Sequence, residues 1–243
     1  LFGNYLPGGL AHRGYAFSQV VDQLGFGTEG IYGIPTYVSS TYIFLFILFG
    51  AFLEQAGMIR LFNDFAMGTV GHTKGGPAKV SVISSGLMGT INGSGVANVV
   101  TTGQFTIPLM KRFGYRADFA GGVEATSSMG GQIMPPVMGA VAFIMAETIN
   151  VPYVEVVKAA TIPALLYFAS AFWMVHLEAG RMGLHGLPKS ECPDAWAAVR
   201  RGWHLILPLA ALVWLLFSGY TPLFSGTVGL ALTAILILGA AIA

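Results

Sequence analysis

The sequence is poor in charge and in cysteine. Only 9% of its 243 residues are Asp, Glu, Lys or Arg, against about 25% in a typical soluble domain. The formal net charge is +1, so the chain lacks the basic surface that nucleic-acid binding requires, and no nucleic-acid partner is expected. The single cysteine, Cys192, excludes a disulfide within the chain and a metal centre built from cysteines alone.

Apolar residues take the place of the missing charge. Hydrophobic residues make up 54% of the chain, and the mean hydropathy is +0.69. Four apolar runs are predicted to cross a lipid bilayer: Ile31–Leu53, Val156–Val175, Trp203–Phe217 and Ser225–Ala243. The expected fold class is therefore an all-α integral membrane protein with several transmembrane helices.

One stretch departs from this pattern. Val80–Met110 contains no charged residue, yet one helix of that length would overshoot a hydrocarbon core of roughly 30 Å. Its middle is rich in glycine and side-chain oxygens: Thr90, Asn92, Gly93, Ser94, Gly95 and Asn98. Two apolar arms joined by this tip predict a re-entrant helical hairpin. Irregular backbone at membrane depth must be packed in protein or line a wet cavity, so the tip is either a corner or a binding site.

Basic residues flank both ends of this stretch. Lys74 and Lys79 precede it, and Lys111, Arg112 and Arg116 follow it. Lys and Arg concentrate in cytoplasmic loops. A hairpin that enters and returns on the cytoplasmic side agrees with this rule, whereas a crossing would place one cluster outside.

A second break follows the hairpin. A helix is expected from near Phe119 to Met129, and the next seven residues, Gly130–Pro136, contain two glycines and two prolines. Proline lacks a backbone donor and restricts the residue before it, so the helix cannot continue. Because the apolar pattern resumes over Val137–Ala146, the sequence predicts a discontinuous helix.

A hairpin followed by a discontinuous helix is typical of one half of an inverted-repeat secondary transporter. The hairpin and the discontinuous helix each consist of two helical arms. Backbone carbonyls at the end of each first arm can bind a cation, and backbone amides at the start of each second arm favour an anion. The predicted cation site consists of Asn92, Gly93, Ser94, Asn98, Ser128, Gly130 and Gly131. The predicted substrate site consists of Ser94, Gly95, Gln132, Pro135 and Pro136.

Plainer interpretations of these residues remain open. The glycines could serve only for close helix packing, and Pro135-Pro136 could merely kink a helix. Glu124 is an intramembrane carboxylate and therefore a functional candidate by default. A salt bridge or a capping role explains it equally well, so it ranks below the tip residues.

Two motifs together carry a family resemblance: GLMGTINGSGVANVVTTGQFTIPLMKRFGY and EATSSMGGQIMPPVMGAVAFIMAE. The phrases FLFILFGAFLEQAG and GGPAKVSVISSG strengthen it. Over about Ile31–Gly186, the sequence resembles the large membrane subunit of tripartite ATP-independent periplasmic (TRAP) transporters. The forms IMPPVMG and VANVVTTG are most similar to the fused permeases of the TAXI branch.

The resemblance implies a multi-pass permease of the bacterial inner membrane that imports small organic anions by an elevator motion, usually with Na⁺ as the coupling ion. The implied partners are a periplasmic substrate-binding protein and, in a fused permease, small-subunit helices in the same polypeptide. The family also has a second, inverted repeat, which this sequence lacks. The sequence is therefore expected to be a fragment of a longer chain.

Three regions follow from this interpretation. Residues 1–79 are expected to form scaffold-like spans and an interfacial amphipathic helix, and residues 80–150 a transport unit. Residues 151–243 are expected to add transmembrane helices, with a cytoplasmic connection near 180–202.

Other function classes remain open: an ion channel with re-entrant loops, and an anion/Na⁺ symporter that needs no binding protein. A selectivity filter requires repeated copies of its loop, and the NGSG tip occurs once. An enzyme is not expected, because HExxH and GxxxxGK[ST] are absent and no nucleophile pairs with a base.

Overall fold

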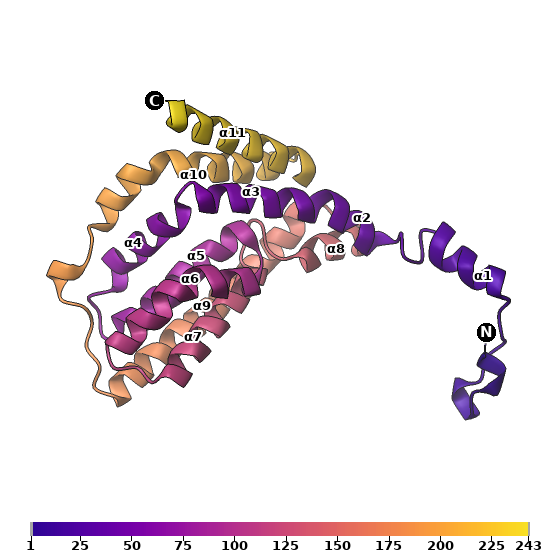
Figure 1. The fold of residues 1–243 in the computed structure, drawn as a ribbon, viewed down its shortest axis with the longest axis horizontal. Coiled ribbons are helices and arrows are strands. Elements are labelled where there is room, and N and C mark those ends of the chain that lie inside the picture. Colours follow the sequence, from indigo (N-terminus) through magenta and orange to yellow (C-terminus); the bar gives the residue numbers. More distant parts are fainter. Residues whose placement is uncertain (1, 243) are drawn as a thin grey trace.

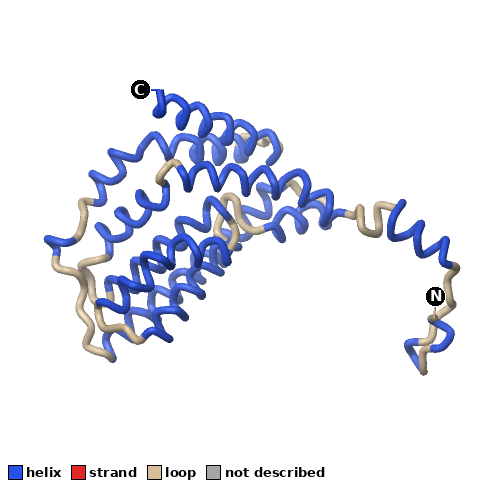
Figure 2. Tube along the Cα trace, viewed as in Figure 1, coloured by secondary structure: helices blue, strands red, loops and turns tan. Residues whose placement is uncertain are grey.

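Helices provide the regular structure of residues 2–242, which are the residues that the computed structural model describes (Figures 1 and 2). The first part of the chain extends away from the other helices (Figure 1). It contains two 3₁₀ turns, α1 and a π turn: Gly3–Tyr5, Gly8–Leu10, Phe17–Val21 and Asp22–Phe26.

Four helical segments are long and apolar enough to cross a membrane: Ile34–Gln55, Tyr153–Arg181, Lys189–Phe217 and Pro222–Gly239. The first contains α2 (Ile34–Val38), a π turn (Ser39–Ile43) and α3 (Phe44–Gln55). The others contain α9 (Tyr153–Arg181), α10 (Ala195–Phe217) and most of α11 (Pro222–Ile242). They match the predicted spans, although Ala243, the end of the last one, lies outside the described residues. The predicted all-α membrane fold is confirmed.

Helix α10 begins inside the segment 180–202 that was predicted as a connection. Its first residue is Ala195, and the side chain of Asp194 caps it by accepting a hydrogen bond from the Trp196 amide at 2.9 Å. Arg200 and Arg201 therefore belong to a helix and not to a loop. The non-helical connection is Met182–Asp194, interrupted by one 3₁₀ turn at Lys189–Glu191.

The predicted helical hairpin is present. Helix α5 (Gly76–Asn92) and helix α6 (Gly95–Arg112) run antiparallel and pack along each other (Figure 1). Gly93, with φ of +57°, and Ser94 form the connection. The Ser94 hydroxyl caps α6 by accepting a hydrogen bond from the Ala97 amide at 3.3 Å.

The predicted discontinuous helix is present as well. Helix α7 (Ala117–Gly130) passes into a 3₁₀ turn, Gly131–Ile133, and the chain is then non-helical as far as Gly139. Helix α8 (Ala140–Ile149) begins three residues later than the predicted Val137, because Met138 has φ of +58° and Gly139 is extended.

Helix α4 (Met58–Val70) is amphipathic, as the sequence predicts. Its buried face contains Leu61, Phe62 and Ala66, and the helix packs between α5 and α10. Two apolar cores result. One joins α3, α4, α8 and α10, around residues such as Phe49 and Leu212, and the other joins the hairpin with α7 and α9 around Met110. The tip end of α5 belongs to the first core, so the hairpin bridges both.

The antiparallel hairpin places both basic clusters at one end, and this arrangement makes the topology testable. Lys74 and Lys111 are exposed, whereas Lys79 is buried, so the first two are the better reporters. In a Cys192→Ser background, we expect Lys74→Cys and Lys111→Cys to react with a membrane-impermeant maleimide only from the cytoplasmic side. Reaction of the two cysteines from opposite sides would contradict the re-entrant topology.

Candidate functional site

The hairpin tip lies directly against the break in the second helix. A Cβ on Gly93 would lie 1.6 Å from the carbonyl oxygen of Met138, and a Cβ on Gly89 would lie 2.3 Å from the Cα of Gly131. Cβ atoms in proteins essentially never approach another heavy atom this closely. Backbone therefore touches backbone at both places, and only glycine permits the two irregular segments to meet at this distance.

A cavity of about 300 Å³ lies where the two segments meet. The tip contributes Asn92, Gly93 and Ser94, and the second break contributes Gln132 and the segment Met138–Val141. Apolar side chains close the remaining walls: Ile43, Phe46, Ile47, Val137 and Phe143. The cavity thus combines two stretches of irregular backbone with the start of helix α8, whose first amides have no partner within the helix.

Several polar side chains at the tip hold the hairpin together. The Asn98 side chain, which is fully buried, donates to the Ser85 carbonyl at 2.8 Å, and its Oδ1 lies 3.2 Å from the Thr102 hydroxyl. Asn92 donates to the Glu54 carboxylate on α3 at 3.1 Å. These amide groups are already engaged, so the groups that remain for an ion are largely backbone carbonyls and amides.

The residues predicted for the two sites fall into three places. Asn92, Gly93, Ser94 and Gln132 line the cavity. Three more pack just behind the cavity: Gly95, Asn98 and Gly131. A Cβ added to Gly95 would lie 3.1 Å from the side-chain amide nitrogen of Gln132. A Cβ added to Gly131 would lie 3.3 Å from the side-chain amide nitrogen of Asn98.

Four predicted residues lie outside the cavity wall. Gly130 faces Tyr167 and Phe168 of α9. Pro136 and Val137 present their carbonyl oxygens to the Tyr153 hydroxyl, at 3.0 and 2.6 Å, and Pro135 precedes them. An unsatisfied buried carbonyl costs about 1–3 kcal/mol, so Tyr153 stabilises the unwound segment. The fourth, Ser128, belongs to a different cluster.

This second cluster surrounds Glu124, which is fully buried. Five hydroxyl groups from three helices contact its carboxylate. Oε1 accepts from Thr102 at 2.5 Å, Ser128 at 2.9 Å and Ser85 at 3.0 Å. Oε2 accepts from Ser81 at 2.7 Å and from Thr106. The hydroxyls therefore link α5, α6 and α7 into one unit around a single carboxylate.

The sequence prediction ranked Glu124 below the tip residues, although a signal for this cluster was available. The hydroxyls form pairs four residues apart, Ser81 with Ser85 and Thr102 with Thr106, and Glu124 stands four residues before Ser128. Residues at this spacing share one face of a helix. Three such polar faces in neighbouring apolar helices indicate a shared polar centre.

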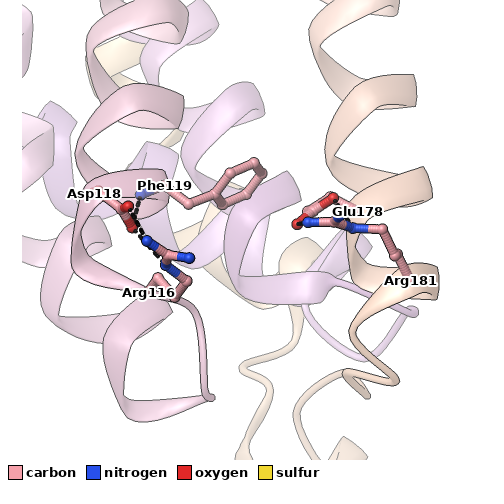
Figure 3. A network of polar contacts seen from close by, with 5 residues as sticks. All are labelled: Arg116, Asp118, Phe119, Glu178 and Arg181. Atoms are coloured by element: carbon pink, nitrogen blue, oxygen red, sulfur yellow. Dashed lines mark hydrogen bonds and ion pairs between the residues drawn. The ribbon is translucent and has the colours of Figure 1, made fainter.

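A larger cavity lies elsewhere. It measures about 780 Å³ and lies between α7 and α9, with walls that include Val123, Tyr167 and Met174. The charged residues among its walls form two ion pairs, Arg116 with Asp118 and Glu178 with Arg181, and the Phe119 ring lies between them (Figure 3). Hydrogen bonds from the Arg116 side chain and the Phe119 amide lower the pKa of Asp118.

Each pair is internally neutral, so this larger cavity has no free charge to attract an anion. The smaller cavity is the better candidate for an ion site, because partial charges of two interrupted helices meet there.

The sequence of residues 15–242 matches a family model described as "Tripartite ATP-independent periplasmic transporter, DctM component". The chain belongs to this TRAP transporter family. The match covers most of the chain, including the hairpin, the discontinuous helix and the helices around them, and it confirms the resemblance to the TRAP large subunit. A TRAP large permease is a multi-pass protein of the inner membrane and a transport component rather than an enzyme.

Curated relatives agree with this assignment. The chain is 29% identical over 178 residues to the C4-dicarboxylate TRAP transporter large permease protein DctM of Pseudomonas aeruginosa, and 28% identical over 178 residues to the sialic acid TRAP transporter large permease protein SiaM of Vibrio cholerae. Each alignment covers 73% of this chain and 41% of the relative. This TRAP chain therefore spans about two fifths of the length of these relatives.

The glycine contacts of this TRAP chain can be tested by substitution. We expect Gly89→Ala and Gly93→Ala to lower stability by about 1–3 kcal/mol, because the added methyl forces backbone apart. Thermal unfolding of the purified protein in detergent measures this loss. Gly121→Ala on α7 is the matched control, since no atom lies within 4 Å of its Cβ position. Equal unfolding temperatures for the Gly93 and Gly121 variants would contradict the close contact of the two breaks.

Proposed function

We propose that this chain forms the first hairpin-and-broken-helix repeat of a permease that imports small organic anions together with Na⁺, and that a periplasmic substrate-binding protein supplies the anion. The observation that carries the proposal is the cavity between the tip and the second break. It is the place in the described chain where both interrupted helices present backbone groups to one space.

The charge of the substrate follows from the walls of this cavity. No Lys, Arg or His contributes to them, whereas the start of α8 does. A helix N-terminus favours an anion by about 0.3–1 kcal/mol, and by more when it is partly buried. A carboxylate fits this field and would accept hydrogen bonds from the first amides of α8. The relatives named for C4-dicarboxylate and sialic acid transport support a carboxylate substrate.

The proposed cation site rests on the backbone carbonyls that have no helical hydrogen-bond partner at the breaks. Oxygen ligands suit a hard cation such as Na⁺. Helix α5 ends at the tip, and its last carbonyl oxygens accept no hydrogen bond from a following helical turn. The engaged side chains of Asn92 and Asn98 leave these carbonyls as the main ligands. A bound Na⁺ would offset the charge of the carboxylate, which makes the two ions natural co-substrates.

The proposed moving unit consists of α5–α8. Its internal links are the Glu124 cluster and the glycine contacts. Its links to the helices α3 and α10 are largely apolar, apart from the hydrogen bond between Asn92 and Glu54. Apolar surfaces can slide without breaking directional bonds, so this boundary suits an elevator motion.

Uptake by the complete permease in liposomes tests the proposal. We expect uptake of a C4-dicarboxylate to require an inward Na⁺ gradient together with the cognate binding protein, and to be at least tenfold slower in Gly93→Ala, because the methyl group enters the cavity wall. Gly121→Ala should transport normally. Uptake that is equally fast without the binding protein, or that needs ATP inside the vesicle, would refute the tripartite mechanism, and ion current without Na⁺-driven accumulation would indicate a channel.

A further inference from the structure

A further cleft, of about 360 Å³, lies between α4 and α10, and none of the residues predicted for the ion and substrate sites lines it. Its walls include two arginines and a histidine: Arg60 from α4, and Arg201 and His204 from α10. Asp64 is the one acidic residue among them, and the remaining wall residues are glycine, alanine and leucine. The cleft therefore carries a net positive charge, in a chain whose formal net charge is only +1.

The two helices that form the cleft run antiparallel and pack closely through glycine. A Cβ on Gly202 of α10 would lie 3.0 Å from the Leu61 side chain of α4, and a Cβ on Gly68 of α4 would lie 2.6 Å from the Ala195 amide nitrogen of α10. An interface this tight has no room for a long charged side chain. Both arginines are accordingly exposed.

The positive charge of the cleft is only partly compensated within the protein. The Arg60 guanidinium lies 3.9 Å from the Asp64 carboxylate, a long distance for an ion pair, and the Arg60 side chain is 85% exposed. Such an exposed pair is weak. Arg201 takes part in none of the ion pairs of the described residues. Its planar fork of N–H donors, which matches the oxygens of a phosphate, is therefore available to an anion.

The start of α10 lies at the predicted cytoplasmic end of the molecule. Helix α10 follows the connection Met182–Asp194, in which the Leu187 amide donates to the Gly71 carbonyl at 2.8 Å, just before the hairpin begins. This is the end that carries the basic clusters. Trp196 and Trp203 are exposed on the first turns of α10, and tryptophan concentrates at the membrane–water interface. The cleft is therefore expected at the depth of the lipid headgroups.

The exposed face of α10 beside the cleft suits a lipid better than a soluble anion. Trp196, Arg200 and Trp203 are spaced four and three residues apart, so they share one face of the helix. The Arg200 guanidinium lies 5.8 Å from the centre of the Trp196 ring. The same face continues deeper into the membrane with the exposed side chains of Leu207 and Trp214. Charge near the headgroups and apolar surface below them match the two parts of a phospholipid.

We propose that the cleft between α4 and α10 binds the headgroup of an anionic phospholipid from the cytoplasmic leaflet. The phosphodiester oxygens accept hydrogen bonds from the guanidinium groups of Arg60 and Arg201, and the acyl chains lie along the exposed apolar face of α10. Basic pockets between transmembrane helices on the cytoplasmic side are suited to anionic headgroups. A zwitterionic lipid adds a cationic group that the arginines repel. One headgroup contacts both helices and therefore stabilises their packing, whatever substrate the permease carries.

Native mass spectrometry of the complete permease tests the site, with dioleoylphosphatidylglycerol and dioleoylphosphatidylcholine as the probes. We expect phosphatidylglycerol to bind more tightly than phosphatidylcholine, and Arg201→Gln to weaken phosphatidylglycerol binding about fivefold. Asp64→Asn should strengthen it, because the substitution removes the negative charge from the cleft. Arg112→Gln is the matched control, since Arg112 is an exposed arginine at the same end of the molecule and does not line the cleft; it should bind like the wild type.

Thermal unfolding in detergent separates lost binding from a damaged fold. Without lipid, Arg201→Gln should unfold at the wild-type temperature, because the side chain is exposed. Phosphatidylglycerol should raise the unfolding temperature of the wild type and of Arg112→Gln, and raise that of Arg201→Gln much less.

Three results would overturn the proposal. The first is equal affinity of the wild type for the two lipids. The second is an equal loss of phosphatidylglycerol binding in Arg201→Gln and Arg112→Gln, which would show that overall charge and not the cleft attracts the lipid. The third is displacement of phosphatidylglycerol by an equal concentration of inorganic phosphate, which would make the cleft a site for soluble anions.

Discussion

Two interrupted helices can meet inside a membrane protein only where nothing separates their backbones. In this TRAP chain the condition is met at Gly93 against Met138 and at Gly89 against Gly131. The cavity, the position of helix α8 and the groups that face the proposed substrate all depend on this contact. Because the contact is between backbone atoms, its position is fixed more tightly than side-chain packing would fix it.

The remaining polar groups satisfy the backbone that the breaks expose. Tyr153 donates to the carbonyls of the unwound segment, Asn98 donates to a carbonyl of the facing helix, and Ser94 caps the returning arm. The bonds of Tyr153 and Ser94 pair backbone groups that the breaks leave without a helical partner, as the absence of water in the hydrocarbon region requires. The irregular segments are therefore held in place by hydrogen bonds within the protein.

The Glu124 cluster gives the same unit internal cohesion. Apolar contacts and a few hydrogen bonds, such as Asn92 to Glu54, join the proposed moving unit to its surroundings, while hydroxyl–carboxylate bonds hold α5, α6 and α7 to each other. The hydroxyl–carboxylate bonds inside the unit favour its motion as one body in the proposed function.

Much of this architecture is predictable from sequence, because the hairpin and the break have local causes. An uncharged run with Gly93-Ser94-Gly95 at its centre predicts a return, and Pro135-Pro136 predicts an interruption. Contacts between segments have no such local cause. The glycine contacts and the hydroxyls around Glu124 come from different helices, and which of their faces meet depends on how the helices pack. The start of α10 was obscured because polar residues on an exposed helix face resemble a loop.

Backbone hydrogen exchange of the complete permease, with and without a saturating organic anion in the presence of Na⁺, tests the central claim most directly. The account predicts slower exchange at the first free amides of α6 and α8, Gly95–Val96 and Ala140–Val141, because the anion would accept hydrogen bonds from the helix starts beside the cavity. Protection confined to the α7–α9 cavity, or no protection at either helix start, would contradict it.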